Sequence, residues 1–157
     1  MNKSIIIGID PDVDKSGIAI YHKETRKIEL FSLAFPEMVE FLMECSINYP
    51  DAIVVVEAGW LNRSNWHLHR GDNIRTAQAK GNHAGRNHET GRKIVEMARH
   101  YGLNVVEQKP LRKCWKGKDG KITHEELLCL PDIDKKTIPN RTNQEERDAA
   151  LLALFWK

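Results

Sequence analysis

The strongest constraint on the fold is the order in which short apolar runs and helical patterns follow one another along the 157-residue chain. The first three runs are joined by short polar connectors, which is typical of an antiparallel meander. Later runs alternate with segments whose apolar residues recur at helical spacing. We expect strands at Ser4 to Asp10, Gly17 to Tyr21, Lys27 to Ala34, Ala52 to Val56 and Leu103 to Val106, and helices at Pro36 to Ile47, Asn87 to Tyr101, Thr123 to Leu130 and Asn143 to Trp156. This order predicts an α/β fold with a five-stranded mixed sheet flanked by helices.

A single domain accounts for residues 1–157, because no repeat, low-complexity tract or linker interrupts the pattern. The glycine-containing polar stretch that follows the fourth strand has no clear apolar period, and parts of it could be helical and parts mobile. The apolar run Ile5 to Ile7 is too short for a signal peptide or a membrane span, and the three cysteines form no CxxC pair. We therefore expect a cytoplasmic protein with reduced thiols.

Positive charge is concentrated in two segments, although the formal net charge of the whole chain is only +2. Residues 59–92 and residues 107–121 each contain six basic and two acidic residues, so the remainder of the chain is net acidic. Such clustering favours a local anionic partner, with nucleic acid as the first candidate. Two solvated charged loops are the alternative.

Acidic residues stand at the ends of two predicted strands. Asp10 ends the first strand and Glu57 follows the buried run Val54 to Val56. In α/β proteins ligands gather at such strand ends, and a carboxylate there is costly to bury without a partner. Taken singly, each acid could simply emerge into solvent or meet an arginine.

The last predicted helix adds Glu145 and Asp148, which share one helical face because they are three residues apart. An exposed helix start would also accept acids, yet Asp148 is followed by an apolar run and so lies at the edge of the buried face. Four carboxylates on rigid elements are the hard oxygen ligands that Mg²⁺ or Mn²⁺ prefers. The set predicts metal-assisted cleavage of a phosphodiester by a two-metal mechanism.

An ordered set of motifs resembles the RuvC family of Holliday-junction resolvases over essentially the whole chain. The matching segments are Gly8-Ile9-Asp10-Pro11 with Ser16-Gly17, Val55-Val56-Glu57, Lys109-Pro110 with Arg112-Lys113 and Gly117, and Asp148-Ala149-Ala150-Leu151. The resemblance implies a ribonuclease H-like fold, a homodimer and divalent-metal cleavage of four-way DNA junctions. It implies that Asp10, Glu57, Glu145 and Asp148 are the catalytic metal ligands.

Three positions depart from the family pattern. Asp12 stands where the family usually has glycine, and Glu145 stands where aspartate or histidine is common. The lysine expected in the short helix after Gly117 has no clean match, because Thr123 or His124 occupies that region. These departures bear on junction specificity more than on metal-dependent cleavage.

DNA contacts are expected on both sides of the acidic residues. The resemblance places an aromatic residue at Trp60, three residues after Glu57, and we expect it to stack on a base near the scissile bond. Packing of Trp60 beneath the following loop is the alternative. We expect the phosphate contacts to come from Arg63, Arg70, Arg112, Lys113, Lys116 and Lys118.

The leading function is a structure-selective, metal-dependent DNA endonuclease that acts on branched DNA. A ribonuclease H-like ribonuclease would use the same chemistry, and a relative that grips branched DNA without cutting would not need four intact acids. An actin-like or sugar-kinase ATPase shares a Gly-Ile-Asp strand but requires two such domains, for which 157 residues are too few. No sequence feature identifies a helper motor or a membrane partner.

Overall fold

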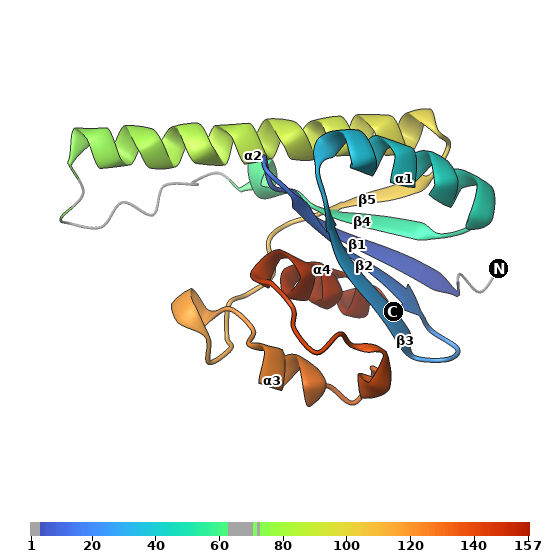
Figure 1. Ribbon diagram of the computed structural model, residues 1–157. Helices are drawn as coiled ribbons and strands as arrows, with labels where there is room; N and C mark the ends of the chain where they lie inside the picture. The colour runs from blue at the N-terminus through green and yellow to red at the C-terminus, as the bar shows by residue number, and fades with distance from the viewer. Residues whose placement is uncertain (1–3, 63–70, 72) are drawn as a thin grey trace.

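All five predicted strands form one mixed sheet in the computed structural model, which describes residues 4–62, 71 and 73–157 (Figure 1). The strand order is β3-β2-β1-β4-β5. The first three strands pair antiparallel, and β4 and β5 extend the sheet in parallel. The strands are β1 (Ile5–Asp10), β2 (Ser16–His22), β3 (Lys27–Leu33), β4 (Ile53–Glu57) and β5 (Asn104–Gln108). The predicted mixed α/β architecture is confirmed.

Helices cover both faces of this sheet. α1 and α2 lie on one face, and α4 lies on the other with α3 beside it (Figure 1). The helices are α1 (Phe35–Asn48), α2 (Ile74–His100), α3 (His124–Leu128) and α4 (Gln144–Phe155). Short 3₁₀ turns follow β4 at Gly59–Leu61 and lie in later loops at Lys118–Gly120 and Lys135–Thr137. Among the described residues, none of these helices combines the length and the apolar character that crossing a bilayer requires.

Two apolar cores form because successive side chains of a strand point to opposite faces of the sheet. In β1, Ile6 packs toward α4, whereas Ile7 and Ile9 pack toward α1 and α2. In β4, Val55 packs toward α4 and its neighbour Val54 packs toward α1 and α2. All of these side chains are fully buried. Burial on both faces explains why these strands are continuous apolar runs.

Helix α2 is longer than the sequence pattern predicted, since it begins at Ile74 and not near Asn87. The side chain of Asn73 caps its start by accepting a hydrogen bond of 2.9 Å from the Thr76 backbone N–H. The buried residues of α2 all lie in its C-terminal part, from Gly91 to Ala98. The N-terminal half of α2 extends beyond the sheet (Figure 1) and has no apolar stripe, so hydrophobic periodicity could not reveal it.

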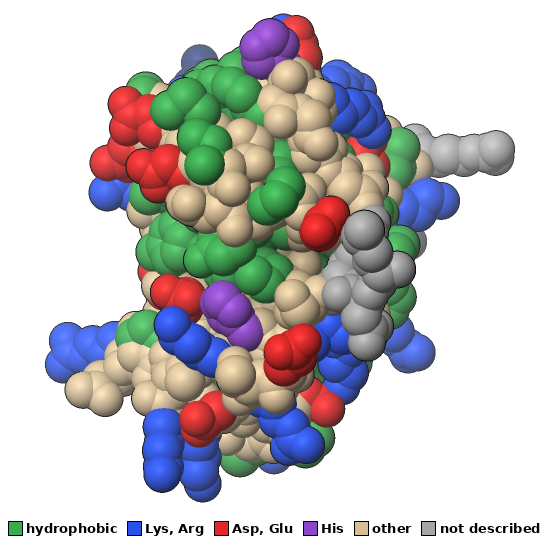
Figure 2. All heavy atoms as spheres, turned by 90° about the vertical axis from the view of Figure 1, so that its right-hand side faces the viewer, with side chains coloured by type: hydrophobic (Ala, Val, Ile, Leu, Met, Phe, Trp, Pro, Cys, Tyr) green, Lys and Arg blue, Asp and Glu red, His purple; other side chains and the backbone are tan. Residues whose placement is uncertain are grey.

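The sequence predicts a dimer interface on the helix that carries Ile94, Met97 and Tyr101, but this face packs on the sheet of its own chain. Ile94 is fully buried against the sheet of its own chain, and Met97 and Tyr101 pack around the same core. Large exposed apolar side chains lie on α1, where Met43 and Ile47 are 44% and 71% exposed, and also at Ile74 on α2 and Phe155 on α4. Figure 2 views the side of the molecule on which α1 ends and shows hydrophobic side chains gathered there.

Helix α4 crosses the sheet at two glycines, which allows its backbone to contact the strands directly. A Cβ atom at Gly8 would collide with the Ala149 carbonyl, and one at Gly17 would collide with the carbonyl of Glu145. Any side chain at either glycine would push the helix away from the sheet. This close approach brings the start of α4 to the end of β1.

Candidate active site

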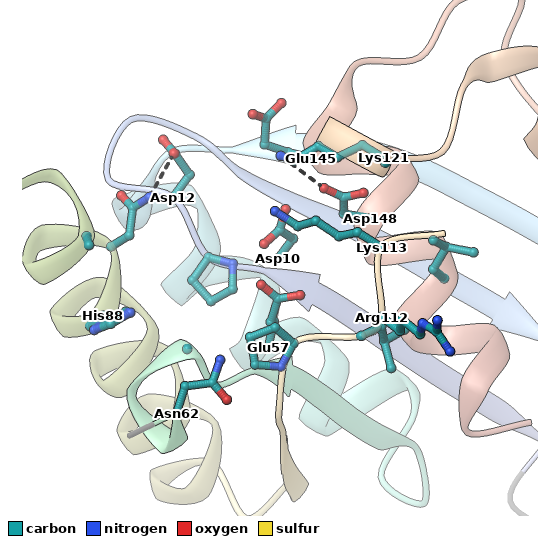
Figure 3. A pocket seen from close by; sticks show the side chains of 18 of the residues that line it. Asp10, Asp12, Glu57, Asn62, His88, Arg112, Lys113, Lys121, Glu145 and Asp148 are labelled. Carbon is teal, nitrogen blue, oxygen red and sulfur yellow. Dashed lines mark hydrogen bonds and ion pairs between the residues drawn. The ribbon is translucent and has the colours of Figure 1, made fainter. Parts of the chain in front are cut away.

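Five acidic residues line one cavity of about 530 Å³ at the edge of the sheet, and three of them, from three elements, are predicted metal ligands that face one another (Figure 3). Asp10 ends β1 and Glu57 ends β4; these strands are parallel neighbours in which Ile9 pairs with Val56, so the two acids lie side by side. Asp148 comes from α4, which the glycine contacts hold against β1. Figure 3 shows the three carboxylates pointing toward one another. The structure thus brings together three of the four predicted ligands.

Burial and mutual repulsion disfavour the charged forms of two of these acids. Desolvation raises the pKa of Asp10 well above its usual range, and the charges of Glu57 and Asp148 raise it further. The pKa of Glu57 is also raised, first by burial and then by Asp148. Negative charge is therefore concentrated without full compensation, which favours a bound cation.

Glu145 lies on the rim of this cluster. It lines the same cavity, yet in Figure 3 its carboxylate points away from the other three. Its charge makes the smallest contribution to the raised pKa of Asp10. The role of Glu145 as a metal ligand stays a prediction. Its position on the rim (Figure 3) indicates that it would contribute less to metal binding than Asp148.

Two lysines supply positive charge to the acidic cluster. The Lys121 ammonium lies 3.5 Å from Oδ2 of Asp148, and the Gln144 amide donates a 2.8 Å hydrogen bond to Oδ1 of the same carboxylate. Lys113 also lines the cavity, and its charge opposes the rise in the pKa of Glu57. Sequence reasoning counted Lys121 only as part of a basic segment and did not place it beside a catalytic acid.

A short network holds the loop that carries Lys121 against the start of α4. The Arg147 guanidinium donates to the backbone carbonyl of Ile122 at 2.9 Å and to that of Thr142 at 2.5 Å. His124 shares a 2.9 Å hydrogen bond with the Thr142 hydroxyl. His124, which stands near the position where the RuvC family has a lysine, therefore has a structural contact, and Lys121 forms the ion pair with Asp148.

Hard oxygen donors make the cavity chemically suitable for Mg²⁺ or Mn²⁺, because Asp10, Glu57 and Asp148 offer only carboxylates. Over the part of the chain that the structure describes, no three Asp, Glu, His or Cys side chains are already close enough to form a metal cluster. Repulsion keeps uncompensated carboxylates apart, and Lys121 occupies part of the space around Asp148. The donor set fits a dication, and the carboxylates would have to move closer together to bind one.

Trp60 packs at the edge of the cavity between α2 and β5. Its ring lies so close to α2 that a Cβ atom at Gly91 would be 2.5 Å from it. Its indole N–H donates a 3.0 Å hydrogen bond to Glu107, and the Arg92 guanidinium lies 5.7 Å from the ring centroid. These contacts favour the packing alternative over stacking on a base.

The predicted phosphate-binding residues divide into two groups. Arg112 and Lys113 line the cavity, whereas the exposed Lys116 and Lys118 lie on the same loop outside it. Arg63 and Arg70 fall outside the described residues. The cavity also includes a wall that sequence reasoning missed, formed by the face of α2 that bears Lys80, His83, Ala84, Asn87 and His88.

Comparison with known proteins supports the fold. No protein-family model matches the sequence, and a search of curated proteins finds no significant sequence similarity. Among solved structures, Thermus thermophilus RuvC in complex with a Holliday junction substrate is similar at 13% identity and a TM-score of 0.52, covering 96% of this chain and 90% of that one. A second Thermus thermophilus RuvC structure gives 16% identity, a TM-score of 0.51 and coverages of 96% and 91%. The chain has the ribonuclease H-like fold.

Proposed function

We propose that this protein is a divalent-metal-dependent DNA endonuclease that cuts branched DNA, with the four-way junction as the first candidate substrate. The observation that carries the proposal is the convergence of Asp10, Glu57 and Asp148 on one cavity bordered by basic residues. The similarity to a RuvC solved with a Holliday junction substrate guides the choice of substrate. We also propose that the protein takes part in DNA recombination and repair.

Asp10, Glu57 and Asp148 would hold Mg²⁺, for which Mn²⁺ could substitute, and Glu145 would complete the set from the rim. The metal supplies an activated water and stabilises the charge that develops on the leaving oxygen. Arg112 and Lys113 are placed to bind the phosphate backbone where it enters the cavity. Lys121 would help to hold the Asp148 carboxylate in position through its ion pair.

Cleavage assays on matched substrates test this function. Labelled four-way junction, flap, duplex and RNA substrates are incubated with Mg²⁺, Mn²⁺ or EDTA, and the Asp10→Asn variant is the control. We expect metal-dependent cutting of branched DNA by the wild-type protein and none by the variant. Cutting of RNA alone would favour the ribonuclease alternative, and tight junction binding without cutting would favour the non-cleaving one.

A homodimer belongs to this proposal, because resolving a junction requires two symmetry-related incisions. The interface must lie outside the buried face of α2 that contains Ile94. Light scattering at micromolar concentration, with and without junction DNA, measures the assembly. A monomer under both conditions would contradict this part of the proposal.

A further inference from the structure

The loop between β1 and β2 is fixed to the middle of α2 by one side chain. Asn87 accepts a 2.9 Å hydrogen bond from the Val13 backbone N–H through Oδ1, and its Nδ2 donates a 3.3 Å hydrogen bond to Oδ2 of Asp12. Figure 3 shows the bond that reaches from Asp12 to this helix. Asp12 and Asn87 are 75 residues apart in sequence, so the contact is specified by the tertiary fold.

Asp12 in turn organises the loop that starts at Asp10. Its second carboxylate oxygen accepts a 2.8 Å hydrogen bond from the Asp14 backbone N–H, and its own N–H donates to the Ser16 hydroxyl at 3.1 Å. Both carboxylate oxygens of Asp12 therefore have a hydrogen-bond partner. Asp12 stands where glycine is usual in the RuvC family. A glycine has no side chain, so it could not accept these hydrogen bonds from Asp14 and Asn87.

The approach of α2 at this point is unusually close. Gly91 lies one turn after Asn87, and a Cβ atom at Gly91 would be 3.1 Å from the Pro11 ring as well as against Trp60. One turn before Asn87, His83 and Ala84 continue the same helical face and line the cavity. The contact with Asp12 therefore lies within the cavity wall that α2 forms, about one turn before the buried part of α2 that begins at Gly91.

We propose that Asn87 and Asp12 form a positioning pair that fixes the α2 wall relative to Asp10, and so sets where a nucleic-acid strand lies against the metal-binding carboxylates. Neither residue reacts with the substrate. The pair acts through Asp10, whose backbone begins the loop that Asn87 holds. This inference rests on the proposed nuclease function for its effect on cleavage, but its effect on metal binding is independent of substrate.

Exchanging the two residues gives a sharp test because the exchange preserves every hydrogen bond. In the D12N/N87D double variant, the new carboxylate at 87 accepts from Val13 N–H and from the new amide at 12, which still accepts from Asp14 N–H through its oxygen. Asn87→Asp alone places two carboxylates face to face and loses one bond. Asp12→Asn alone must give up one of three hydrogen bonds: the one from Asp14, the one between residues 12 and 87, or the one from Val13.

The first measurement is the single-turnover rate of four-way junction cleavage at saturating DNA, well below the melting temperature of each variant. Displacing a reacting group by about 1 Å can cost about 100-fold in rate. We expect each single variant to lose about 10- to 100-fold with little change in junction affinity, and the double variant to recover to within about threefold of wild type. Asn82→Asp, an exposed change on the same helix, is the matched control and should leave the rate unchanged.

The second measurement is Mn²⁺ affinity in the absence of DNA, by calorimetry. Charge alone would shift the two single variants in opposite directions, since Asp12→Asn removes a negative charge and Asn87→Asp adds one. Loss of positioning weakens Mn²⁺ binding in both, and the double variant restores it. Opposite shifts, or no recovery in the double variant, would overturn the positioning pair. If the variants show this pattern of Mn²⁺ affinity but the wild-type protein cuts no substrate, the nuclease function is refuted and the positioning pair is retained.

Discussion

The ammonium of Lys121 lies 3.5 Å from Oδ2 of Asp148, so the acidic cluster contains a counterion supplied by the chain itself. A bound dication and the Lys121 ammonium would compete for the same negatively charged carboxylate. We therefore predict that Lys121→Met binds Mg²⁺ more tightly than wild type, although it cleaves DNA more slowly because Asp148 loses one of its two positioning contacts. Calorimetric titration with Mg²⁺ measures the first effect. Lys118→Met on the same loop is the control, and weaker Mg²⁺ binding by Lys121→Met would contradict the prediction.

Replacing Asp10 by asparagine should remove cleavage and stabilise the metal-free protein. Because the pKa of Asp10 is raised in the folded state, wild type loses stability as pH rises from the ordinary aspartate pKa of about 3.9 through the raised value. The Asp10→Asn variant has no such loss. Its advantage in free energy of unfolding should therefore vanish below about pH 4 and grow as the pH rises above that value.

Urea denaturation of both proteins in EDTA at several pH values measures this difference. Added Mg²⁺ should then raise the melting temperature of wild type and have little effect on the variant, because ligands stabilise the state that binds them. A variant that is less stable than wild type at pH 7 in EDTA would show that Asp10 has a structural role that outweighs the repulsion.

The direct contact between α4 and the sheet predicts a strong asymmetry among glycine substitutions. Gly8→Ala should destabilise the fold by more than about 3 kcal/mol, because the new methyl group would collide with the Ala149 carbonyl in the α4 backbone. Gly85→Ala is the control: it lies inside α2 with no atom within 4 Å of the added Cβ, and should stabilise by about 0.5–1 kcal/mol. Chemical denaturation compares the two variants, and equal effects would argue against the close approach of α4.

The order and type of the strands could be predicted from sequence because burial on both faces produces continuous β-branched runs, such as Val54 to Val56. The carboxylates at strand ends could be found for the same reason, since Asp10 and Glu57 interrupt such runs. The first half of α2 could not, because it projects beyond the sheet and needs no apolar stripe. Contacts that join distant segments, such as Lys121 with Asp148 and Asn87 with Asp12, depend on the tertiary fold and leave no local pattern.

The packing of Trp60 predicts that removing its ring lowers the stability of the whole protein. Trp60→Ala should lower the melting temperature and impair all substrates alike, because the ring fills the space beside Gly91 and its N–H bonds to Glu107. Trp60→Phe keeps most of the ring and loses the hydrogen bond, which contributes about 0.5–1.5 kcal/mol. Thermal unfolding and cleavage are measured together. Normal stability combined with a selective loss on branched DNA would restore the base-stacking role.

Two lysines of one loop should affect DNA binding and DNA cleavage differently. Lys116 is exposed outside the cavity, so Lys116→Ala should weaken binding to every DNA and reduce the slope of log affinity against log salt by about one unit. Once DNA is saturating, its cleavage rate should equal that of wild type. Lys113 lines the cavity and its charge acts on Glu57, so Lys113→Ala should reduce the salt slope and also slow cleavage at saturating DNA.

Binding measured from low to high salt and single-turnover cleavage separate these two effects. The mainchain N–H of Lys116 bonds to Glu126 and is retained in the alanine variant, so the loop should keep its shape. If Lys116→Ala slows cleavage at saturating DNA as much as Lys113→Ala does, then the loop works as one rigid unit and the cavity boundary drawn between the two lysines is wrong.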